Sequence, residues 1–489
     1  MATIDELRKT RLKKLEVIKK AGLLAYPLHT KREHSCKEAL EKFILLAQEQ
    51  KEVILAGRIK SLRGHGGSTF LNIEDGSGKI QAYLKKDRIG ELGYQFFLDN
   101  FDVGDFIELR GILFLTKKEE KTLEVADFKM LAKSLLPLPE KWHGLQDIEE
   151  RYRKRYLDLI FNQDVKNKFE LRTKIIKEIR QFLEREGFLE VETPILQPLY
   201  GGANARPFKT HLNALDMDLY LRISPELYLK RLLVGGFEKV YEFARCFRNE
   251  GMDRQHNPDF TNLEFYWAYA DYKDLMNLTE RLFSTVLKNL FGTYQLEYEN
   301  KKIDFKTPWP RMEYSKLFKK YAKIDLDAIN EEALRKEAQK MGINIERGEG
   351  KAVIADKIYK KCCLPEISNP VFLIHHPKGS APLAKECEKE PEKLARFQLV
   401  IAGWEIVNAF SELNDPLEQR KRFELQEKIL KAGHEEAMKM DEDFIEALEY
   451  GMPPSAGFGM GIDRLTALLT NSHSLRDIIL FPAMRQKKD

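Results

Sequence analysis

The spacing of apolar residues changes twice along the first third of the chain. In residues 4–21, Leu7, Leu12, Leu15 and Ile18 recur at helical spacing among basic side chains, which predicts an amphipathic helix. Two interpretations of its basic face stay open. It is the solvated side of a helix that packs on its neighbour, or it contacts RNA phosphates.

Five short runs with strand-like patterns follow, separated in part by glycine-rich turns, over residues 53–59, 70–74, 80–84, 106–114 and 123–128. A helical stretch near residues 89–98 lies between the third and the fourth. Five strands with a helix after the third is the order of an oligonucleotide-binding (OB) barrel. The pattern alone is equally consistent with a small β-barrel that has no ligand. We expect an N-terminal helical segment over 1–50 and the barrel over 51–136.

The rest of the chain mixes helix and strand patterns. The run Pro137-Leu138-Pro139-Glu140 predicts a linker, and residues 137–168 lead into a second domain over 169–489. A helix over 173–186 ends at Gly187, and a strand over 188–192 ends before Pro194. Residues 313–361 read as a charged, helix-rich insertion that gives no functional signal.

Residues 240–247 and 260–268 predict two strands joined by a charged loop. Arg248 and Glu250 follow the first strand, and Glu264 and Tyr266 lie two residues apart on one face of the second. Such a hairpin suits binding of a phosphate chain and an amine together. By itself, it is equally consistent with a surface hairpin whose charges pair.

Composition excludes several classes of protein. The chain is 43% hydrophobic and 32% charged, as expected of a soluble globular protein, and its net charge of +4 is too small to indicate nucleic-acid binding by itself. The five cysteines form no CxxC pair, so we expect neither a zinc ribbon nor a disulfide framework. No run approaches the roughly 18 apolar residues that a membrane span needs. We therefore expect a cytoplasmic protein without a membrane segment.

Three sequence motifs, taken together, are specific enough to indicate a family. Phe247-Arg248-Asn249-Glu250-Gly251, with His256-Asn257-Pro258 and the run 261–266, resembles motif 2 of the class II aminoacyl-tRNA synthetases. Residues 173–194 resemble motif 1, and the run 457–464 with 479–482 resembles motif 3. From Asp5 to Arg485 the chain is similar to the class II lysyl-tRNA synthetases of the bacterial type. The resemblance implies an α+β fold, in which an N-terminal OB barrel precedes an antiparallel-sheet catalytic domain, and a homodimer through motif 1.

The resemblance also implies an ATP site and an amino-acid site. Arg248 would hold the α-phosphate, and Phe260 and Arg464 would sandwich the adenine. Arg248 and Arg464 are thus the expected catalytic residues, and the expected ATP ligands are Arg248, Glu250, His256, Asn257, Phe260, Glu405, Asn408 and Arg464. The expected lysine ligands are Gly202, Glu226, Glu264, Tyr266, Asn408, Phe410 and Glu412. Of these, Gly202 and Glu226 would bind the α-amino group, and Tyr266 and Glu412 the ε-ammonium.

The expected metal site departs from the family. Ala402-Gly403 predicts a tight hairpin turn between residues 398 and 405, positions where the family usually has two carboxylates that hold Mg²⁺ on the triphosphate. Here they are Gln398 and Glu405, so Mg²⁺ should be held more weakly. Simple alternation would turn Asn408 away from Glu405, so we expect a β-bulge near Ile406 or Val407.

The resemblance implies that the barrel reads an anticodon with Phe70, Gln81 and Asp127. The expected activity is that of a lysine–tRNA ligase acting on L-lysine, ATP and tRNA-Lys. Glu226 favours lysine, because the aspartyl and asparaginyl enzymes generally carry Gln there. Three alternatives are weighed: another class IIb synthetase of aspartyl or asparaginyl type, a lysyl transferase acting on a protein, and a non-catalytic RNA-binding paralogue.

Overall fold

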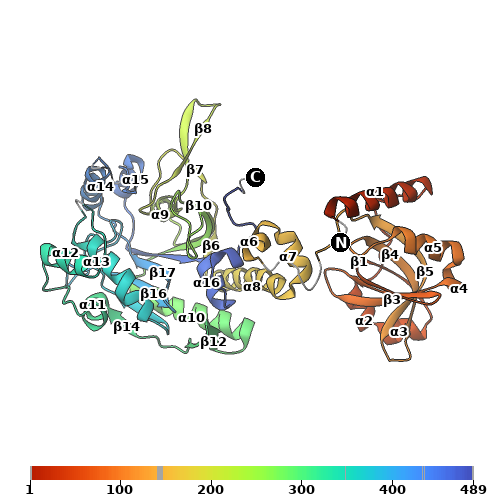
Figure 1. The fold of residues 1–489 in the computed structure, drawn as a ribbon. Coiled ribbons are helices and arrows are strands. Elements are labelled where there is room, and N and C mark those ends of the chain that lie inside the picture. The colour runs from red at the N-terminus through yellow and green to blue at the C-terminus, as the bar shows by residue number, and fades with distance from the viewer. Residues whose placement is uncertain (1–2, 140–146, 347–348, 432, 434–435, 487–489) are drawn as a thin grey trace. The chain divides into compact units, whose positions relative to one another are not determined.

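Contacts within the chain divide it near Gln146 into two units, Met1–Gln146 and Asp147–Asp489. The structure is a computed structural model that describes residues 3–139, 147–346, 349–431, 433 and 436–486 (Figure 1). Glu140, the last residue of the expected linker motif, lies outside these ranges. No helix within them is long and apolar enough to cross a membrane.

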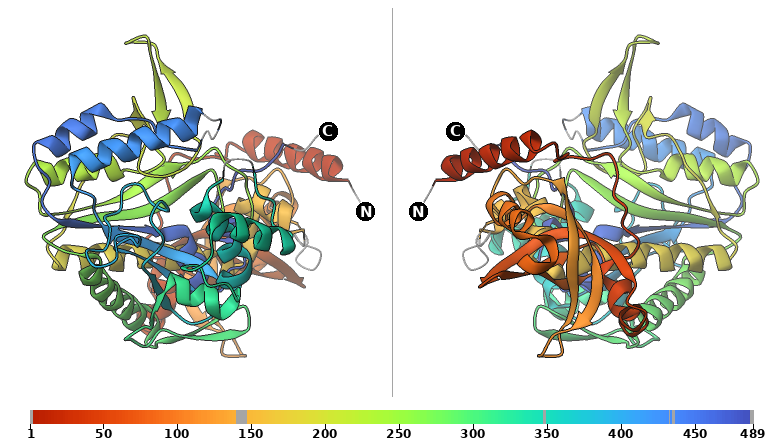
Figure 2. Two further views of the ribbon diagram at one scale, coloured as in Figure 1. Left: turned by 90° about the vertical axis from the view of Figure 1, so that its left-hand side faces the viewer. Right: turned by 90° about the vertical axis from the view of Figure 1, so that its right-hand side faces the viewer.

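The first unit is built on a closed five-stranded barrel with the strand order β1-β2-β3-β5-β4 (Figure 2, right). Its strands are β1 (Glu52–His65), β2 (Ser68–Glu74), β3 (Lys79–Lys85), β4 (Phe106–Leu115) and β5 (Lys121–Ala132). Helices α4 (Lys86–Ile89) and α5 (Glu91–Asn100) lie between β3 and β4. The expected barrel and its helix are confirmed, because alternate residues of β2 and β3 point into a buried core.

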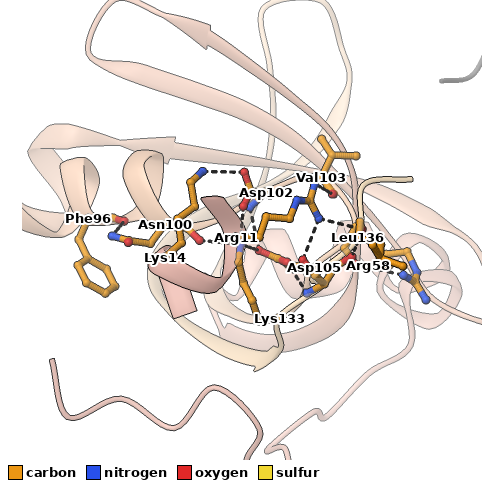
Figure 3. A network of polar contacts seen from close by, with 12 residues as sticks. Arg11, Lys14, Arg58, Phe96, Asn100, Asp102, Val103, Asp105, Lys133 and Leu136 are labelled. Carbon is orange, nitrogen blue, oxygen red and sulfur yellow. Dashed lines mark hydrogen bonds and ion pairs between the residues drawn. The ribbon is translucent and has the colours of Figure 1, made fainter. Parts of the chain in front are cut away.

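Helix α1 (Ile4–Lys20) packs on α5, with α2 (Cys36–Glu41) and α3 (Phe43–Gln48) further along the unit. The buried guanidinium of Arg11 donates to the carbonyls of Val103, Ser134 and Leu136 at 2.9–3.1 Å (Figure 3). Packing on a neighbouring helix, the first interpretation of this helix, is therefore confirmed. Its basic residues, apart from Arg11, remain at the surface or partly exposed.

Beneath α1, the buried ammonium of Lys133 donates to Asp102, to Asp105 and to the carbonyl of Asn100 at 2.5–2.8 Å (Figure 3). Lys14 of α1 also pairs with Asp102 at 2.7 Å. A buried ammonium is tolerated only when such partners surround it. This network fixes α1 to the end of β5, where the chain leaves the barrel.

The second unit contains an eight-stranded sheet with the order β14-β15-β16-β17-β18-β11-β10-β6. All neighbours are antiparallel except the two edge pairs, β14 with β15 and β10 with β6. The strands are β6 (Leu189–Glu190), β10 (Lys239–Phe247), β11 (Asp259–Ala268), β14 (Arg311–Glu313), β15 (Val371–Ile374), β16 (Arg396–Ile401), β17 (Trp404–Ser411) and β18 (Ser455–Gly461). Two small sheets accompany it, made of β7 (Leu196–Gln197), β9 (Met217–Leu221) and β8 (Phe208–Leu212), and of β12 (Gln295–Tyr298) and β13 (Lys301–Asp304).

Helices cover the two faces of this sheet differently (Figures 1 and 2). On one face, α8 (Gln163–Arg185), α10 (Tyr272–Phe291) and α16 (Ile462–Leu469) pack with the strands into the main hydrophobic core. On the other, α9 (Glu226–Val234), α14 (Pro416–Lys431) and α15 (Glu442–Glu449) form a smaller core with the strand ends. The described helices leave the middle of this second face open to a cavity.

Two sequence expectations need correction here. The expected helix over 173–186 begins ten residues earlier, as α8, and two helices that we did not expect, α6 (Ile148–Arg153) and α7 (Arg155–Phe161), precede it. The buried Asp158 pairs with Arg151 and Arg155, which stabilises these short helices. The strand expected over 188–192 is only two residues long, β6, and it pairs with the start of β10.

Residues 313–361 belong to the crossover between the parallel strands β14 and β15. They form α11 (Tyr314–Tyr321), α12 (Glu331–Lys340) and α13 (Lys351–Ile358), followed by a π-helical turn, Tyr359–Cys363. Their apolar residues make a separate core that is completed by Leu373 of β15 and Val400 of β16. This crossover core is attached to the sheet edge.

Candidate active site

The floor of the uncovered face is made by β18, where glycine occupies every second position. Gly457, Gly459 and Gly461 alternate with buried residues, so no side chain rises from the central strand. The register aligns Gln398, Asn408, Gly459 and Glu264 in one row across the sheet, and Arg396, Phe410, Gly457 and Tyr266 in the next. Residues that are far apart in the sequence thus meet over one glycine strand.

Above this floor lies a cavity of about 800 Å³. It is lined by nearly all of the expected ATP, lysine and metal residues: Gly202, Glu226, Arg248, Glu250, His256, Asn257, Phe260, Glu264, Tyr266, Gln398, Glu405, Asn408, Phe410 and Arg464. Glu412 is the exception. It is 1% exposed and lies behind the cavity wall.

One end of the cavity is acidic. Glu264 accepts hydrogen bonds from Ser224 and Asn262 at 2.9 Å and from the Tyr266 hydroxyl at 3.1 Å. Burial, together with the charge of Glu226, raises the pKa of Glu264 to about 7 in spite of these donors. A cation placed beside Glu264 would favour its ionised form.

A resident cation lies behind the acidic end. The buried ammonium of Lys230 is 2.6 Å from Glu226, which is one helical turn away on α9, and it also pairs with Glu412. Burial raises the pKa of both carboxyls, and Lys230 only partly offsets this effect. One lysine is therefore shared by two carboxylates, and Glu264 is a third buried carboxylate of the same end.

At two glycines the backbone lies close to a glutamate side chain of the acidic end. A Cβ on Gly457 would lie 2.0 Å from Glu412 Oε1, so the absence of a side chain opens the wall to this oxygen. Glu412 Oε1 has no hydrogen-bond partner among the described residues. Gly202 has φ +83°, and a Cβ there would lie 2.8 Å from Glu226 Cβ.

The other end of the cavity is rich in arginine. The guanidinium of Arg248 lies 5.0 Å from the ring centroid of Phe260. Arg464 donates to the Glu405 carbonyl at 3.0 Å and lies 3.1 Å from His256 Nε2. The amide of Asn257 donates to the Asp259 carbonyl at 2.7 Å, which shapes the loop between β10 and β11. An aromatic face and clustered guanidinium groups suit a nucleotide.

The hairpin of β16 and β17 carries the expected bulge. Leu399 pairs with Val407 and Val400 pairs with Glu405, so Ile406 is the extra residue, and the prediction is confirmed. Ala402 and Gly403, with φ of +51° and +73°, make the expected tight turn. The bulge brings Glu405 and Asn408 to the same cavity.

The two expected metal positions differ in how well they fit Mg²⁺. Glu405 Oε1 is buried without a hydrogen-bond partner among the described residues, as suits an oxygen that awaits a cation. Gln398, in contrast, is neutral, and its Oε1 lies 3.0 Å from Nε2 of the buried His376. In the described part of the chain, no three His, Cys, Asp or Glu side chains cluster as a metal site. Glu405 thus fits Mg²⁺ with a charged oxygen, whereas Gln398 can offer only a neutral one.

The expected anticodon residues lie on the outer surface of the barrel. The ring of Phe70 on β2 is 4.6 Å from that of Tyr83 on β3, and Gln81 accepts a hydrogen bond from Thr122 at 2.9 Å. Both are partly exposed, on the face that alternation turns away from the core. Asp127 is exposed beyond a bulge in β5 and lies 3.5 Å from Arg110.

Comparison with known proteins agrees with this arrangement. The family model described as tRNA synthetases class II (D, K and N) matches residues 147–485, and that of the OB-fold nucleic acid binding domain matches residues 53–131. The chain belongs to the class II tRNA synthetase family.

Three relatives named lysine–tRNA ligase cover almost the whole synthetase. That of Pelotomaculum thermopropionicum is 50% identical over 488 residues, 99% of this chain and 96% of its own. That of Carboxydothermus hydrogenoformans is 49% identical over 486 residues, 99% of each chain. That of Thermotoga maritima is 45% identical over 489 residues, covering 99% and 97%.

Three cations of this synthetase's site were not expected from the sequence. Lys230 could have been found, because it follows Glu226 at i+4 on a helix. Arg396 lines the cavity and donates to Asn408 at 2.8 Å. It could also have been found, because it lies two residues before Gln398 and therefore on the same face of the strand. Lys360 also lines the cavity, but it belongs to the crossover, and no local pattern pointed to it.

We predict that Lys230→Met destabilises the synthetase by roughly 3–5 kcal/mol, because two buried carboxylates lose their shared cation. Glu226 and Glu412, with their raised pKa, bind protons more tightly in the folded state than in the unfolded state, so folding weakens as pH rises above their ordinary pKa. The loss should therefore be larger at pH 8 than at pH 6. Denaturant titrations at both pH values measure it, and the exposed Lys428→Met is the control. An equal, small effect of both variants would contradict the shared pairing.

Proposed function

We propose that this synthetase is a lysine–tRNA ligase, which joins L-lysine to the 3′ end of tRNA-Lys and converts ATP to AMP and diphosphate. The observation that carries the proposal is the charge pattern of the cavity. At one end lie three buried carboxylates, two of which share the ammonium of Lys230, and arginines cluster at the other end. Full-length relatives that are 45–50% identical bear the same name.

Lysine suits the acidic end because it carries two ammonium groups. With all three ionised, Glu226, Glu264 and Glu412 exceed Lys230 by two negative charges, which the two ammonium groups of the substrate would neutralise. Gly202 and Glu226 would bind the α-ammonium. Glu412 Oε1 and the Tyr266 hydroxyl would meet the ε-ammonium, with Phe410 and Asn408 forming the adjacent wall.

The alternatives fit this site less well. An aspartate or asparagine pocket would need free donors around a short acidic or amide side chain, and Lys230 is already engaged by two carboxylates. A lysyl transferase acting on a protein would not need the N-terminal barrel, which this chain has. A non-catalytic paralogue is disfavoured by the intact Arg248, Glu250 and Arg464.

The reaction requires no side-chain nucleophile. A lysine carboxylate oxygen attacks the α-phosphorus of ATP and diphosphate leaves, and then a 3′-terminal ribose hydroxyl of the tRNA attacks the adenylate carbonyl and AMP leaves. Arg248 would stabilise the charge that builds on the α-phosphate, and Arg464 and Phe260 would hold the adenine. His256, Asn257 and Glu250 would position the nucleotide from the motif 2 loop.

Magnesium fits the site through Glu405 and the substrate. When bound, Mg²⁺ would neutralise charge on the triphosphate and so assist departure of diphosphate. Glu405 would hold it with its buried Oε1, which has no hydrogen-bond partner in the part of the chain that the structure describes. Gln398, as expected from the sequence, would contribute at most a neutral oxygen.

The barrel would bind the anticodon. Phe70 offers a ring for stacking, beside Tyr83, and Gln81 can hydrogen-bond a base edge, with Asp127 as a third reader. Motif 1, which comprises α8 and β6, would form the interface of a cytoplasmic homodimer.

The direct test of the proposal is ATP–pyrophosphate exchange measured with each common amino acid. The kcat/KM of exchange should be higher for lysine than for any other amino acid by a factor on the order of 10⁴. A pocket built on buried polar groups rejects substrates that leave these groups unpaired. Exchange driven by aspartate or asparagine would favour the related synthetases. If none of the amino acids supports exchange, the non-catalytic alternative is favoured.

A sharper prediction concerns Glu412. Glu412→Gln should lower kcat/KM for lysine roughly a hundredfold to a few thousandfold, because the ε-ammonium loses its buried counter-charge. Norleucine, which is lysine with a hydrogen in place of the ε-ammonium group, should lose much less in the same exchange assay. Glu424→Gln, at an exposed position on α14, is the control. Equal losses for both substrates would mean that Glu412 serves only to pair with Lys230.

The two units should separate by function. Phe70→Ala and Gln81→Ala should weaken aminoacylation of tRNA and leave lysine-dependent exchange nearly unchanged. Loss of one stacked base costs about 1–3 kcal/mol. Aminoacylation kinetics with varied tRNA measure the effect, and Leu92→Ala, at an exposed site on α5, is the control. If both variants aminoacylate tRNA with the kinetics of the native protein, these residues do not contact the tRNA.

A further inference from the structure

The crossover between β14 and β15 contributes a cation to the ATP end of the cavity. Lys360 stands in the π-helical turn Tyr359–Cys363 and lines the cavity, and its side chain is 57% exposed. Its neighbours Tyr359 and Cys363 are buried in the crossover core, so the backbone that carries it is anchored. Its Nζ lies 2.8 Å from Asp356, which is its ion-pair partner one turn earlier.

Lys360 lies in the electrostatic reach of Glu405, the residue suited to Mg²⁺. Burial lowers the pKa of its ammonium, but Asp356 and Glu405 more than offset this effect, and the pKa is raised. Lys360 therefore carries its charge at neutral pH. The ion pair with Asp356 joins two partly exposed side chains, and pairs of this kind contribute little, so a phosphate can displace it.

Because residue 398 is Gln, the same end of the cavity has one carboxylate fewer to bind a divalent cation. A carboxylate there would hold a divalent cation together with Glu405, whereas the amide of Gln398 is neutral and its oxygen is close to His376. The triphosphate still needs positive charge beyond the α-phosphate. Lysine is a common phosphate ligand, since its three donors act as a compact point charge.

We propose that Lys360 binds the phosphates of ATP that leave as diphosphate, in place of a divalent cation that Gln398 does not hold. The synthetase would then work with one divalent cation fewer than a site with carboxylates at both positions. The inference rests on ATP as the substrate, as in the proposed function, and it names a phosphate-binding residue outside the motif 1, 2 and 3 segments.

The first experiment measures ATP binding to the full chain by calorimetry in buffer with EDTA. Native protein should bind ATP without metal, and Lys360→Met should bind it roughly ten- to a hundredfold more weakly, as expected for loss of one charged hydrogen-bonding partner. Lys361→Met is the matched control, because the next residue donates to the Met341 carbonyl and does not line the cavity. Lys360→Gln repeats the test if the methionine variant fails to fold.

The second experiment counts bound Mn²⁺, as a spin probe for Mg²⁺, in the presence of ATP and the absence of amino acid. The double variant Gln398→Glu/Lys360→Met should bind one more Mn²⁺ than the native protein. An unchanged metal-free ATP affinity in Lys360→Met, or equal Mn²⁺ counts, would each overturn the inference. Neither readout involves lysine, so failure here is distinguishable from exchange that favours another amino acid.

Discussion

The register between β11, β18 and β17 is the constraint on which the whole site depends. Side chains alternate between the two faces of a strand, so a slip of one residue would turn Glu264 and Tyr266 into the main core. The long pairing of β11 with β10 on one side and with β18 on the other prevents such a slip. The bulge at Ile406 then corrects the phase of β17, which lets Glu405 share the cavity with Asn408 and Phe410.

The charged side chains of the cavity are separated, with negative charge in excess at one end and positive charge in excess at the other. At one end the carboxylates outnumber the cations, and burial raises the pKa of Glu226, Glu264 and Glu412. At the other end arginines and Lys360 surround Glu405. A zwitterionic substrate with an extra ammonium group, lying beside a polyanion, complements both ends at once. Burying more carboxylates than cations at the acidic end lowers the stability of the fold, as is common where binding is the task.

Much of this could be read from the sequence. The barrel strands and the motif 2 hairpin were predictable, because alternation and turn residues are local signals. The bulge was predictable because Glu405 and Asn408 could share a face only if one residue were extra. The helices α6 and α7 were missed, since their stability comes from Asp158 and its arginine partners and not from an apolar stripe. Lys360 was missed because the cavity residues that it joins, such as Glu405 and Arg464, are distant along the chain, which no periodicity reveals.

The separate core of the crossover has an evolutionary consequence. The proposed lysine pocket is built from strands whose neighbours are fixed on both sides, so a change at Glu264 or Gly457 disturbs several contacts together. Lys360 sits on a partly exposed turn whose packing is carried by other residues. Its identity can therefore change by single substitutions while the sheet stays intact. On the proposed role of Lys360, the metal requirement is thus open to change by single substitutions in a way that the choice of amino acid is not.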